Sequence, residues 1–433
     1  MKNTQTVICG AGIAGVATAY YLAVKCGQQD VVLVDRLQPL SLTTSKSGEN
    51  IRDYWPQPCM ASLSDRSIEL MEELAAESSD GFRLRFSGYD FVSESPGREI
   101  FPSEHLRGTD DTNNGGPDGE PGPVRIIDRN SIKQDFPWLS DAISQVVHIP
   151  RAGTIDVYAL GSLLLDRARR AGVDILQARV SAIHQPASGG FELQLGRKGA
   201  VGTLRAEKLV LAAGPFTSEL AGMLGIELPI ENFLQRKIVI RDPQCIVPRD
   251  MPFTVFADQQ KLIWNDEERE LISEDPEYRW LLDEFPAGLH IKPESRDQVK
   301  LGWAYNRLPE KPRWELDDDI DFPNIVMRGA SRFMPALRAY VEELPTPVVQ
   351  MAGYYSRTPE NWPLIGPLEV EGSFTVAALS GFGTMAACAA GELCAAWMTD
   401  APLPGYARNF HPNRYSDPGI MTEISEIESD GQL

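Results

Sequence analysis

One stretch near the start constrains the fold of this chain most. An apolar run at residues 6–9 leads into three glycines with the G-x-G-x-x-G spacing: Gly10, Gly12 and Gly15. A helix-like segment follows at residues 14–25, and a second apolar run at residues 31–34 ends in an acid. This order predicts a Rossmann-type βαβ unit that binds a dinucleotide. A glycine-rich turn that binds no ligand is the alternative that the spacing leaves open.

Each residue type in this unit has a physical task. Gly10 makes the tight turn, Gly12 lets a pyrophosphate approach the backbone, and Gly15 lets the helix pack on the sheet. The helix N-terminus offers free N–H groups and a partial positive charge to the phosphates. The acid, twenty residues past Gly15, is placed to accept hydrogen bonds from a ribose hydroxyl. The further cofactor contacts predicted here are Ile13, Ala14, Asp35 and Arg36.

The composition is that of a water-soluble globular chain. The chain has 433 residues, 42% apolar and 24% charged, which predicts two domains or one large discontinuous unit. No run of eighteen apolar residues and no signal-peptide pattern occurs, so we expect a cytoplasmic protein without a membrane span. The formal net charge of -20 argues against nucleic acid and anionic membranes as partners. The six cysteines and five histidines are scattered without metal-ligand spacing, so we expect no metal.

The rest of the chain predicts two interleaved domains. Between residues 229 and 306, strand-like runs alternate with charged turns, which is typical of an antiparallel sheet. The predicted fold class is α/β, with a Rossmann-type domain and a second, mainly antiparallel α+β domain. We expect the cofactor domain to be discontinuous and to combine residues 1–85, 150–228 and 325–410. The substrate domain then combines 86–149 and 229–324, and a C-terminal tail follows at 411–433.

Two further segments are candidates for cofactor contact. Residues 42–52 are rich in Ser, Thr and Gly, which suits a loop along a bound cofactor, although an ordinary surface loop has the same composition. The apolar run at residues 209–212 ends in a glycine turn, which is another strand end that meets a cofactor in such folds. The candidate residues of these segments are Thr44, Ser45, Lys46, Ser47, Gly48, Ala213 and Gly214. Val180, in a short strand predicted at residues 179–184, is a further candidate.

Four segments together carry a family resemblance: the glycine motif, residues 209–214, residues 358–367 (TPENWPLIGP) and residues 380–385 (SGFGTM). With them the chain resembles the FAD-dependent D-amino-acid oxidase superfamily, nearest to the sarcosine oxidase and glycine oxidase branch. The resemblance implies oxidation of the C–N bond of a small-molecule amine or amino acid, hydrolysis of the imine, and reoxidation of the flavin by O2 or an electron carrier. It implies FAD contacts at Pro363, Gly381, Phe382, Gly383, Thr384 and Met385.

The departures from the family pattern predict a different pocket. Gly353 stands where sarcosine oxidases can carry a flavin-bound cysteine, so we expect non-covalent FAD. Met385 and Phe382 replace a lysine and a histidine of the family's glycine-rich motif. An apolar pocket follows from these replacements, and with it a secondary amine or amino acid bulkier than sarcosine.

Two basic residues are the catalytic candidates. The VKLGWA segment resembles the family segment whose lysine assists O2 reduction, which implies that role for Lys300. A solvated strand lysine is the alternative. Arg52 follows the Ser/Gly-rich loop and is suited to bind a carboxylate bidentately or to anchor the loop. His290 lies in the predicted antiparallel sheet; we expect a structural histidine, and a pocket residue is the alternative.

Three other classes share parts of this pattern. A flavin monooxygenase of the aromatic hydroxylase type needs a Gly-Asp motif in the C-terminal third, which is absent. An FAD-dependent dehydrogenase that passes electrons to a carrier stays open, as does a protein that only binds a dinucleotide. An absorbance spectrum and bleaching by an amine separate these classes. The sequence carries no signal for an oligomeric state.

Overall fold

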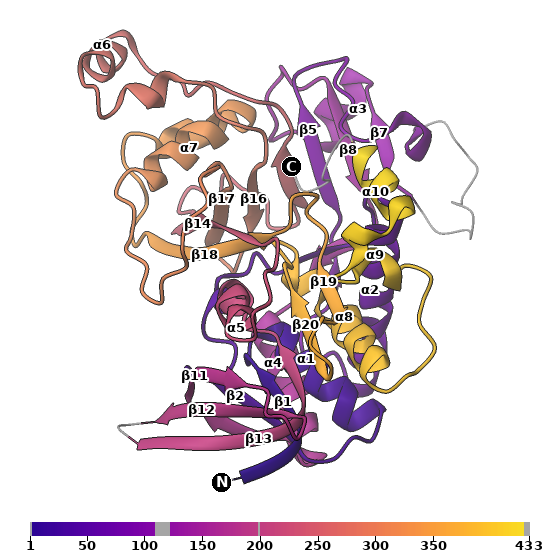
Figure 1. The fold of residues 1–433 in the computed structure, drawn as a ribbon. Helices are drawn as coiled ribbons and strands as arrows, with labels where there is room; N and C mark the ends of the chain where they lie inside the picture. The colour runs from indigo at the N-terminus through magenta and orange to yellow at the C-terminus, as the bar shows by residue number, and fades with distance from the viewer. Residues whose placement is uncertain (1, 109–121, 198–199, 428–433) are drawn as a thin grey trace.

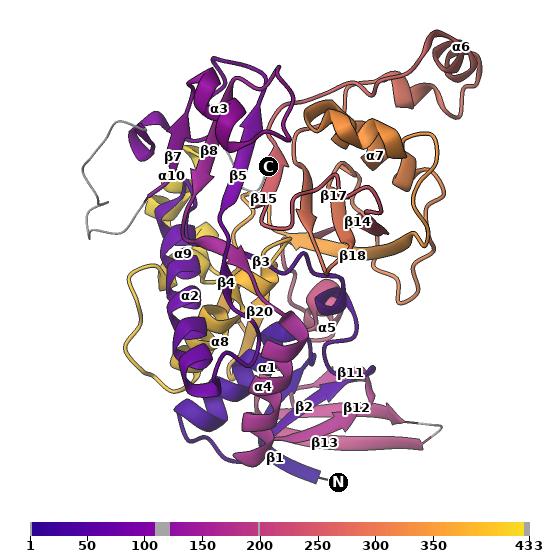
Figure 2. The same cartoon turned by 180° about the vertical axis from the view of Figure 1, so that it is seen from behind.

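Two large β-sheets organise the protein in the computed structural model, which describes residues 2–108, 122–197 and 200–427 (Figure 1). The first sheet has eight strands and the second has nine. Both views place the first sheet at one end of the molecule and the second sheet with helix α7 toward the other (Figures 1 and 2). No helix of the described residues combines the length and the apolar character needed to cross a bilayer.

The first sheet has the order β10-β2-β1-β13-β12-β11, and β20 pairs with both β13 and β19. Strand β1 runs parallel to β2 and β13, so that Cys9 lies opposite both Val34 and Leu211. The carboxyl ends of these three strands therefore meet at one edge, where doubly wound sheets bind ligands. The strands are β1 (Lys2–Cys9), β2 (Val31–Asp35), β10 (Asp174–Gln177), β11 (Arg179–His184), β12 (Phe191–Arg197), β13 (Ala200–Leu211), β19 (Leu364–Pro367) and β20 (Ser373–Ala377).

Helices cover the first sheet and pack closely on one another. Helix α1 (Ile13–Tyr20) contacts both α4 (Val157–Arg170) and α8 (Gly383–Met398), and α2 (Pro58–Ser78) contacts α8. Small residues allow this approach, because a Cβ atom at Gly391 would lie 2.7 Å from the carbonyl carbon of Ala17. Residues Val31–Val34 are all buried, as expected for parallel strands covered by helices.

The second sheet has the order β18-β14-β17-β16-β15-β5-β8-β7-β6 and is mainly antiparallel. Its apolar face packs under α7 (Phe322–Phe333), where Leu289, Leu301 and Trp303 are buried. The strands are β5 (Tyr89–Ser93), β6 (Arg107–Gly108), β7 (Val124–Ile126), β8 (Gln145–Ile149), β14 (Glu231–Arg241), β15 (Phe253–Phe256), β16 (Leu289–Pro293), β17 (Gln298–Trp303) and β18 (Val349–Arg357).

Smaller elements connect the two sheets. Strands β3 (Asn50–Arg52), β9 (Ala152–Thr154) and β4 (Arg85–Phe86) form a three-stranded sheet of their own. The remaining helices are α3 (Arg129–Asp135), α5 (Thr217–Gly222), α6 (Asp266–Glu274), α9 (Ala407–Phe410) and α10 (Pro418–Ser425).

The strand pairing differs from the predicted domain bounds, in which residues from 325 onward belong to the cofactor domain again. Strand β18 pairs with β14 along its whole length, and α7 packs into the core of the second sheet. Both elements thus belong with the second sheet, because hydrogen bonding and burial join them to it. The division into cofactor and substrate domains stays a proposal. In the segment expected to be a tail, residues 411–427 are described and include the buried Arg414, whereas 428–433 lie outside the described residues.

Candidate active site

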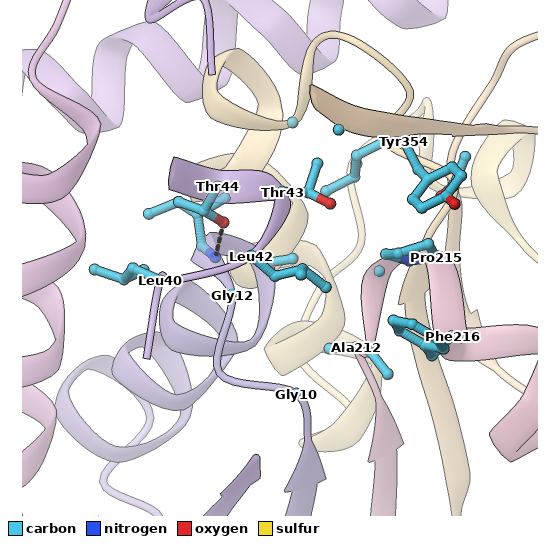
Figure 3. Close-up of a pocket in the computed structure, with 18 of the residues that line it drawn as sticks. Gly10, Gly12, Leu40, Leu42, Thr43, Thr44, Ala212, Pro215, Phe216 and Tyr354 are labelled. Atoms are coloured by element: carbon cyan, nitrogen blue, oxygen red, sulfur yellow. Dashed lines mark hydrogen bonds between the residues drawn. The ribbon is translucent and has the colours of Figure 1, made fainter. Parts of the chain in front are cut away.

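A large cavity lies at the carboxyl edge of the first sheet (Figure 3). The ends of β1, β2 and β13, the loop at residues 40–48 and the start of α8 form its walls. Sixteen of the predicted cofactor contacts line it, from six separate segments of the chain. They are Gly10, Gly12, Ile13, Ala14, Asp35, Arg36, Thr44, Lys46, Ser47, Gly48, Val180, Ala213, Gly214, Gly381, Gly383 and Thr384.

The three glycines of the turn differ in the space that is open for a side chain at each position. Gly10 has a φ of +112°, and a Cβ atom there would lie 2.2 Å from the carbonyl oxygen of Ala212. A Cβ at Gly15 would lie 2.0 Å from the Gly10 oxygen. At Gly12, by contrast, the nearest atom to a Cβ is Thr44 Oγ1, at 3.4 Å. Gly12 therefore leaves room on the cavity side, at the N-terminus of α1, which fits a phosphate cradle.

Hydrogen bonds join the loop at residues 40–48 to the N-termini of α1 and α8. Thr44 Oγ1 accepts a hydrogen bond from the Ile13 backbone N–H at 3.1 Å, drawn as a dashed line in Figure 3. The hydroxyls of Ser47 and Thr384 are 2.6 Å apart and form a second hydrogen bond. These two contacts hold the loop across the cavity.

Asp35 lines the cavity beside the glycine turn. Its Oδ2 accepts a hydrogen bond from the Ala11 N–H at 2.7 Å, and its Oδ1 accepts one from the Leu37 N–H at 2.8 Å. Burial raises the pKa of this carboxyl, and the backbone hydrogen bonds oppose the shift. Each carboxylate oxygen has further lone pairs, so a ribose hydroxyl can still donate to Asp35. Together with the cradle at Gly12, the lining fits a dinucleotide such as FAD.

A second, smaller cavity adjoins the first. Ser47, Gly48, Lys237, Tyr355 and Gly381 line both cavities. The second cavity extends from them toward the second sheet, and its wall combines aromatic and apolar side chains with polar and charged ones. Besides the shared residues its lining consists of Glu49, Asn50, Arg52, Trp55, Tyr89, Phe253, Val255, His290, Ala304, Phe382 and Met385.

Arg52 lies in the wall of the second cavity among aromatic rings. It is only 2% exposed. Its guanidinium carbon lies 4.4 Å from the ring centroid of Trp55, 5.4 Å from that of Tyr89 and 5.2 Å from that of Phe91. Cation–π contacts of this kind hold a guanidinium in place, so Arg52 is a fixed cation in this wall.

Lys237 lies where the two cavities meet. Its Nζ donates a hydrogen bond to the Lys46 carbonyl at 3.2 Å and lies 5.7 Å from the ring centroid of Tyr355. Burial lowers the pKa of Lys237 to about 7, and the positive charges of Lys300 and Lys292 add to the effect. Sequence reasoning missed this lysine, whose only local signal is its place in the alternating pattern of a strand.

His290 faces the second cavity, although we expected a structural histidine. Its Nδ1 lies 3.0 Å from the Gly288 carbonyl oxygen and therefore carries the hydrogen of that bond, which leaves Nε2 as an acceptor. Burial, followed by the positive charge of Lys237, lowers the pKa of His290 to about 3. The ring is thus neutral near pH 7.

Lys300 lines neither cavity of the described structure. Its Nζ lies 3.2 Å from Glu49 Oε2 and 2.9 Å from Glu294 Oε1, and the residue is 5% exposed. Glu49 follows Gly48 directly, so this ion pair connects the second sheet to the loop that borders both cavities.

The remaining predicted contacts are distributed differently. Phe382 and Met385 line the second cavity, whereas Gly15, Ser45 and Pro363 line neither. The Ser45 hydroxyl donates to the Leu42 carbonyl at 2.7 Å, within its own loop. Leu42, Thr43 and Ala212 also line the first cavity and lie in the predicted segments. Lining residues that sequence reasoning missed include Pro215, Phe216, Trp314, Tyr354 and Tyr355.

Comparisons with known proteins agree with this geometry. A family model described as FAD dependent oxidoreductase matches residues 5–397. The mitochondrial dimethylglycine dehydrogenase of Rattus norvegicus is 26% identical over 423 residues, which cover 95% of this chain and 45% of the relative. The sarcosine oxidase subunit beta of Arthrobacter sp is 27% identical over 238 residues, or 53% of this chain and 56% of the relative. The chain thus spans about half the length of these curated relatives.

Solved structures share the fold over nearly the whole chain. The L-proline dehydrogenase from P. horikoshii gives a TM-score of 0.71 at 19% identity and covers 96% of this chain and 98% of that one. The glycine oxidase from Geobacillus kaustophilus gives a TM-score of 0.71 at 18% identity, with 96% and 99% covered. At these identities the likeness shows the fold alone, and it confirms the predicted fold class.

Proposed function

Because this chain belongs to the FAD dependent oxidoreductase family, we propose that it oxidises the C–N bond of an amino acid or secondary amine bulkier than sarcosine. The family match confirms the resemblance inferred from the sequence. The observation that carries the proposal is the pair of adjoining cavities. One has a dinucleotide cradle, and the other has aromatic walls and a buried arginine.

The residues of the first cavity would hold FAD. The backbone at Gly12 and the N-terminus of α1 would receive the pyrophosphate, and Asp35 a ribose hydroxyl. The loop at residues 40–48 and the start of α8 would receive the flavin end, which borders the second cavity. The flavin supplies the redox chemistry when bound, and the protein supplies position and charge.

The second cavity would bind the substrate. Arg52 is the candidate for a carboxylate, because a fixed guanidinium binds one bidentately. Trp55, Tyr89, Phe253 and Met385 would cover apolar surface of the substrate, at about 25 cal/mol per Å² buried. This lining supports a substrate with an apolar substituent.

A panel of amines tests the reaction class. Sarcosine, N,N-dimethylglycine, L-proline and N-methyl-L-phenylalanine are added to the FAD-loaded protein without oxygen, and the flavin absorbance is followed. Bleaching, fastest with the bulkiest N-methyl amino acid, is the expected result. Bleaching by sarcosine alone would overturn the proposed bulk of the substrate, and bleaching by no amine would overturn the reaction class.

The electron acceptor is proposed to be O2, and an electron carrier is the second candidate. Two of the similar proteins are named dehydrogenases, which favours the carrier. The role of Lys300 in O2 reduction stays a prediction, and the two carboxylates beside Lys300 cancel part of its field at the cavity. Mixing the amine-reduced protein with aerated buffer decides between the acceptors. Reoxidation within seconds supports O2, and reoxidation only with an added artificial acceptor supports a carrier.

We expect the FAD to be bound without a covalent link. Gly353 lines the first cavity, and no thiol is available at this position. Acid precipitation of the holoprotein should therefore leave the yellow colour in the supernatant. Flavin that stays in the protein pellet would contradict this prediction.

Asp35→Ala should weaken the binding of FAD. The loss of a charged acceptor is worth about 1.5–3 kcal/mol, which corresponds to an increase of the FAD Kd by about 10- to 150-fold. Titration of the apoprotein with FAD, followed by flavin fluorescence, measures this change. Asp128→Ala is a matched control, because Asp128 caps α3 and lines neither cavity. Equal Kd values for the two variants would refute the assignment of Asp35.

A further inference from the structure

The wall of the second cavity has an arginine at one end and a lysine at the other. From Arg52 the wall continues to Tyr89, at 5.4 Å, then to Phe253, at 4.4 Å between ring centroids, and to His290, at 5.1 Å. His290 and Lys237 meet over Gly302, where a Cβ would lie 2.4 Å from His290 Nε2 and 2.9 Å from Lys237 Cγ. Arg52 lines only the second cavity, whereas Lys237 also lines the first. Lys237 therefore marks the end of the wall nearest the cofactor.

This arrangement sets the direction of a bound amino acid. The bond to be oxidised must reach the flavin, so the amine belongs at the junction of the two cavities. The carboxylate then points away from the junction, toward Arg52. The ionisable side chains nearest the amine are Lys237 and Tyr355, because they line both cavities.

The charges around Lys237 come from three strands and one loop. Lys292 on β16 and Lys300 on β17 share the sheet face of Lys237, together with the neutral His290. Tyr355 faces it from β18, and Glu49 faces it from the loop. Glu49 and Glu294 pair with Lys300, and Glu294 also lies 3.5 Å from Lys292. Within residues 2–108, 122–197 and 200–427, no ion pair neutralises Lys237 itself.

Two consequences follow from the burial of Lys237 without an ion pair of its own. The same burial disfavours the charged form of an amine at the junction, so a substrate ammonium group should give up its proton to react there. Lys237 is itself easily deprotonated, because its pKa is lowered to about 7. The neutral Nζ keeps a lone pair while it donates one hydrogen to the Lys46 carbonyl.

We propose that Lys237 is the proton acceptor of the reaction: its neutral Nζ takes the proton from the ammonium group of the substrate. An N–H bond of the ammonium breaks, an N–H bond forms on Nζ, and the electron pair stays on the substrate nitrogen. Nothing is oxidised or reduced in this step, and the proton returns to water afterwards. The inference rests on the proposed function and adds a catalytic residue to it.

The test is the pH profile of flavin reduction in the FAD-loaded protein without oxygen, with the best amine of the panel. The wild-type rate should fall as the pH drops below about 7, where Lys237 becomes charged. Lys237→Met should be slower by about 10²- to 10⁴-fold at neutral pH. The deficit should shrink toward about pH 10, where the amine loses its proton in solution. Lys237→Arg keeps the cation but accepts no proton, and it should be equally slow at neutral pH.

Lys292→Met is the matched control, because Lys292 shares the sheet face but lines neither cavity. Removal of its positive charge should raise the pKa of Lys237, so the profile should shift to higher pH while the limiting rate at high pH is kept. A mere loss of structure would lower the rate at every pH.

A second readout is independent of turnover. Lysines methylated reductively with ¹³C-formaldehyde are titrated by NMR, and the signal absent in Lys237→Arg belongs to Lys237. A midpoint near 7 supports the proposal, and a midpoint near that of free lysine, about 10.4, overturns it. Wild-type rates of Lys237→Met at neutral pH would also overturn it, with the proposed function intact. If no amine reduces the wild-type flavin, the proposed function itself fails.

Discussion

Arg414→Met should lower the free energy of unfolding by about 3–5 kcal/mol, the cost of leaving one partner of a buried ion pair uncompensated. Arg414 is 1% exposed, and its Nε donates to Glu360 Oε1 at 2.7 Å. The same guanidinium donates to the carbonyl oxygens of Pro363, at 2.6 Å, and Trp362, at 3.0 Å. The substitution leaves a buried carboxylate and two carbonyls with fewer partners, which explains the size of the effect.

Chemical unfolding at saturating FAD measures this loss. Arg408→Met is the control, because Arg408 pairs with Glu423 at the surface, with side chains 62% and 44% exposed, and should lose less than about 1 kcal/mol. The double variant Arg414→Met with Glu360→Gln should be more stable than Arg414→Met alone, since it removes the orphaned charge. Equal losses for Arg414→Met and Arg408→Met would show that the buried Arg414–Glu360 ion pair contributes no more than a surface pair.

The hydrogen bond from Arg414 gives the Pro363 carbonyl a structural role, and the FAD contact implied for Pro363 stays a prediction. Residues 358–367 resemble a family segment, and the resemblance implied a cofactor contact at Pro363. In the structure the Pro363 carbonyl accepts a hydrogen bond from Arg414, more than fifty residues further along the chain. A contact between such distant segments leaves no trace in the local sequence, so neither the burial of Arg414 nor its partner was predictable.

The first cavity was the most predictable part of the site. The glycine turn, helix and acid of the βαβ unit lie within about thirty residues, and each is defined by local backbone chemistry. Gly12 and Asp35 both line the cavity for that reason. The start of α8 was also found, because its glycines form a short contiguous motif.

The second cavity was less predictable because strand pairing builds it. Lys237, His290 and Lys300 lie on three strands, and only the register of β14, β16 and β17 shows that they share a face. The resemblance of the VKLGWA segment implied a role for Lys300, which lines neither cavity of the described structure, whereas Lys237 lines both. The sequence predicted both strands, whereas the pairing that brings Lys237 and His290 together left no signal in the local sequence.

Gly12→Val should reduce the affinity for FAD by about 5- to 150-fold while the apoprotein stays folded. A Cβ at Gly12 meets no protein atom closer than Thr44 Oγ1, at 3.4 Å, so the fold tolerates a side chain there. The added methyl groups would occupy the place of the pyrophosphate, and overpacking of this kind costs about 1–3 kcal/mol or more. Gly10→Ala should instead destabilise the fold, because its Cβ would lie 2.2 Å from the Ala212 carbonyl oxygen at a φ of +112°.

FAD titration and thermal unfolding of the apoproteins separate these two effects of glycine substitution. Gly405→Val is the control, since Gly405 is exposed and has open space where a Cβ would be. We expect its FAD Kd and its melting temperature to match those of the wild type. Gly12→Val should change only the Kd, and Gly10→Ala should lower the melting temperature.

Wild-type affinity in Gly12→Val would show that the pyrophosphate does not lie on this turn. Equal melting losses in Gly12→Val and Gly10→Ala would show that both glycines are structural. Because the two positions are two residues apart in one turn, only the space beside each backbone separates a ligand contact from a folding constraint.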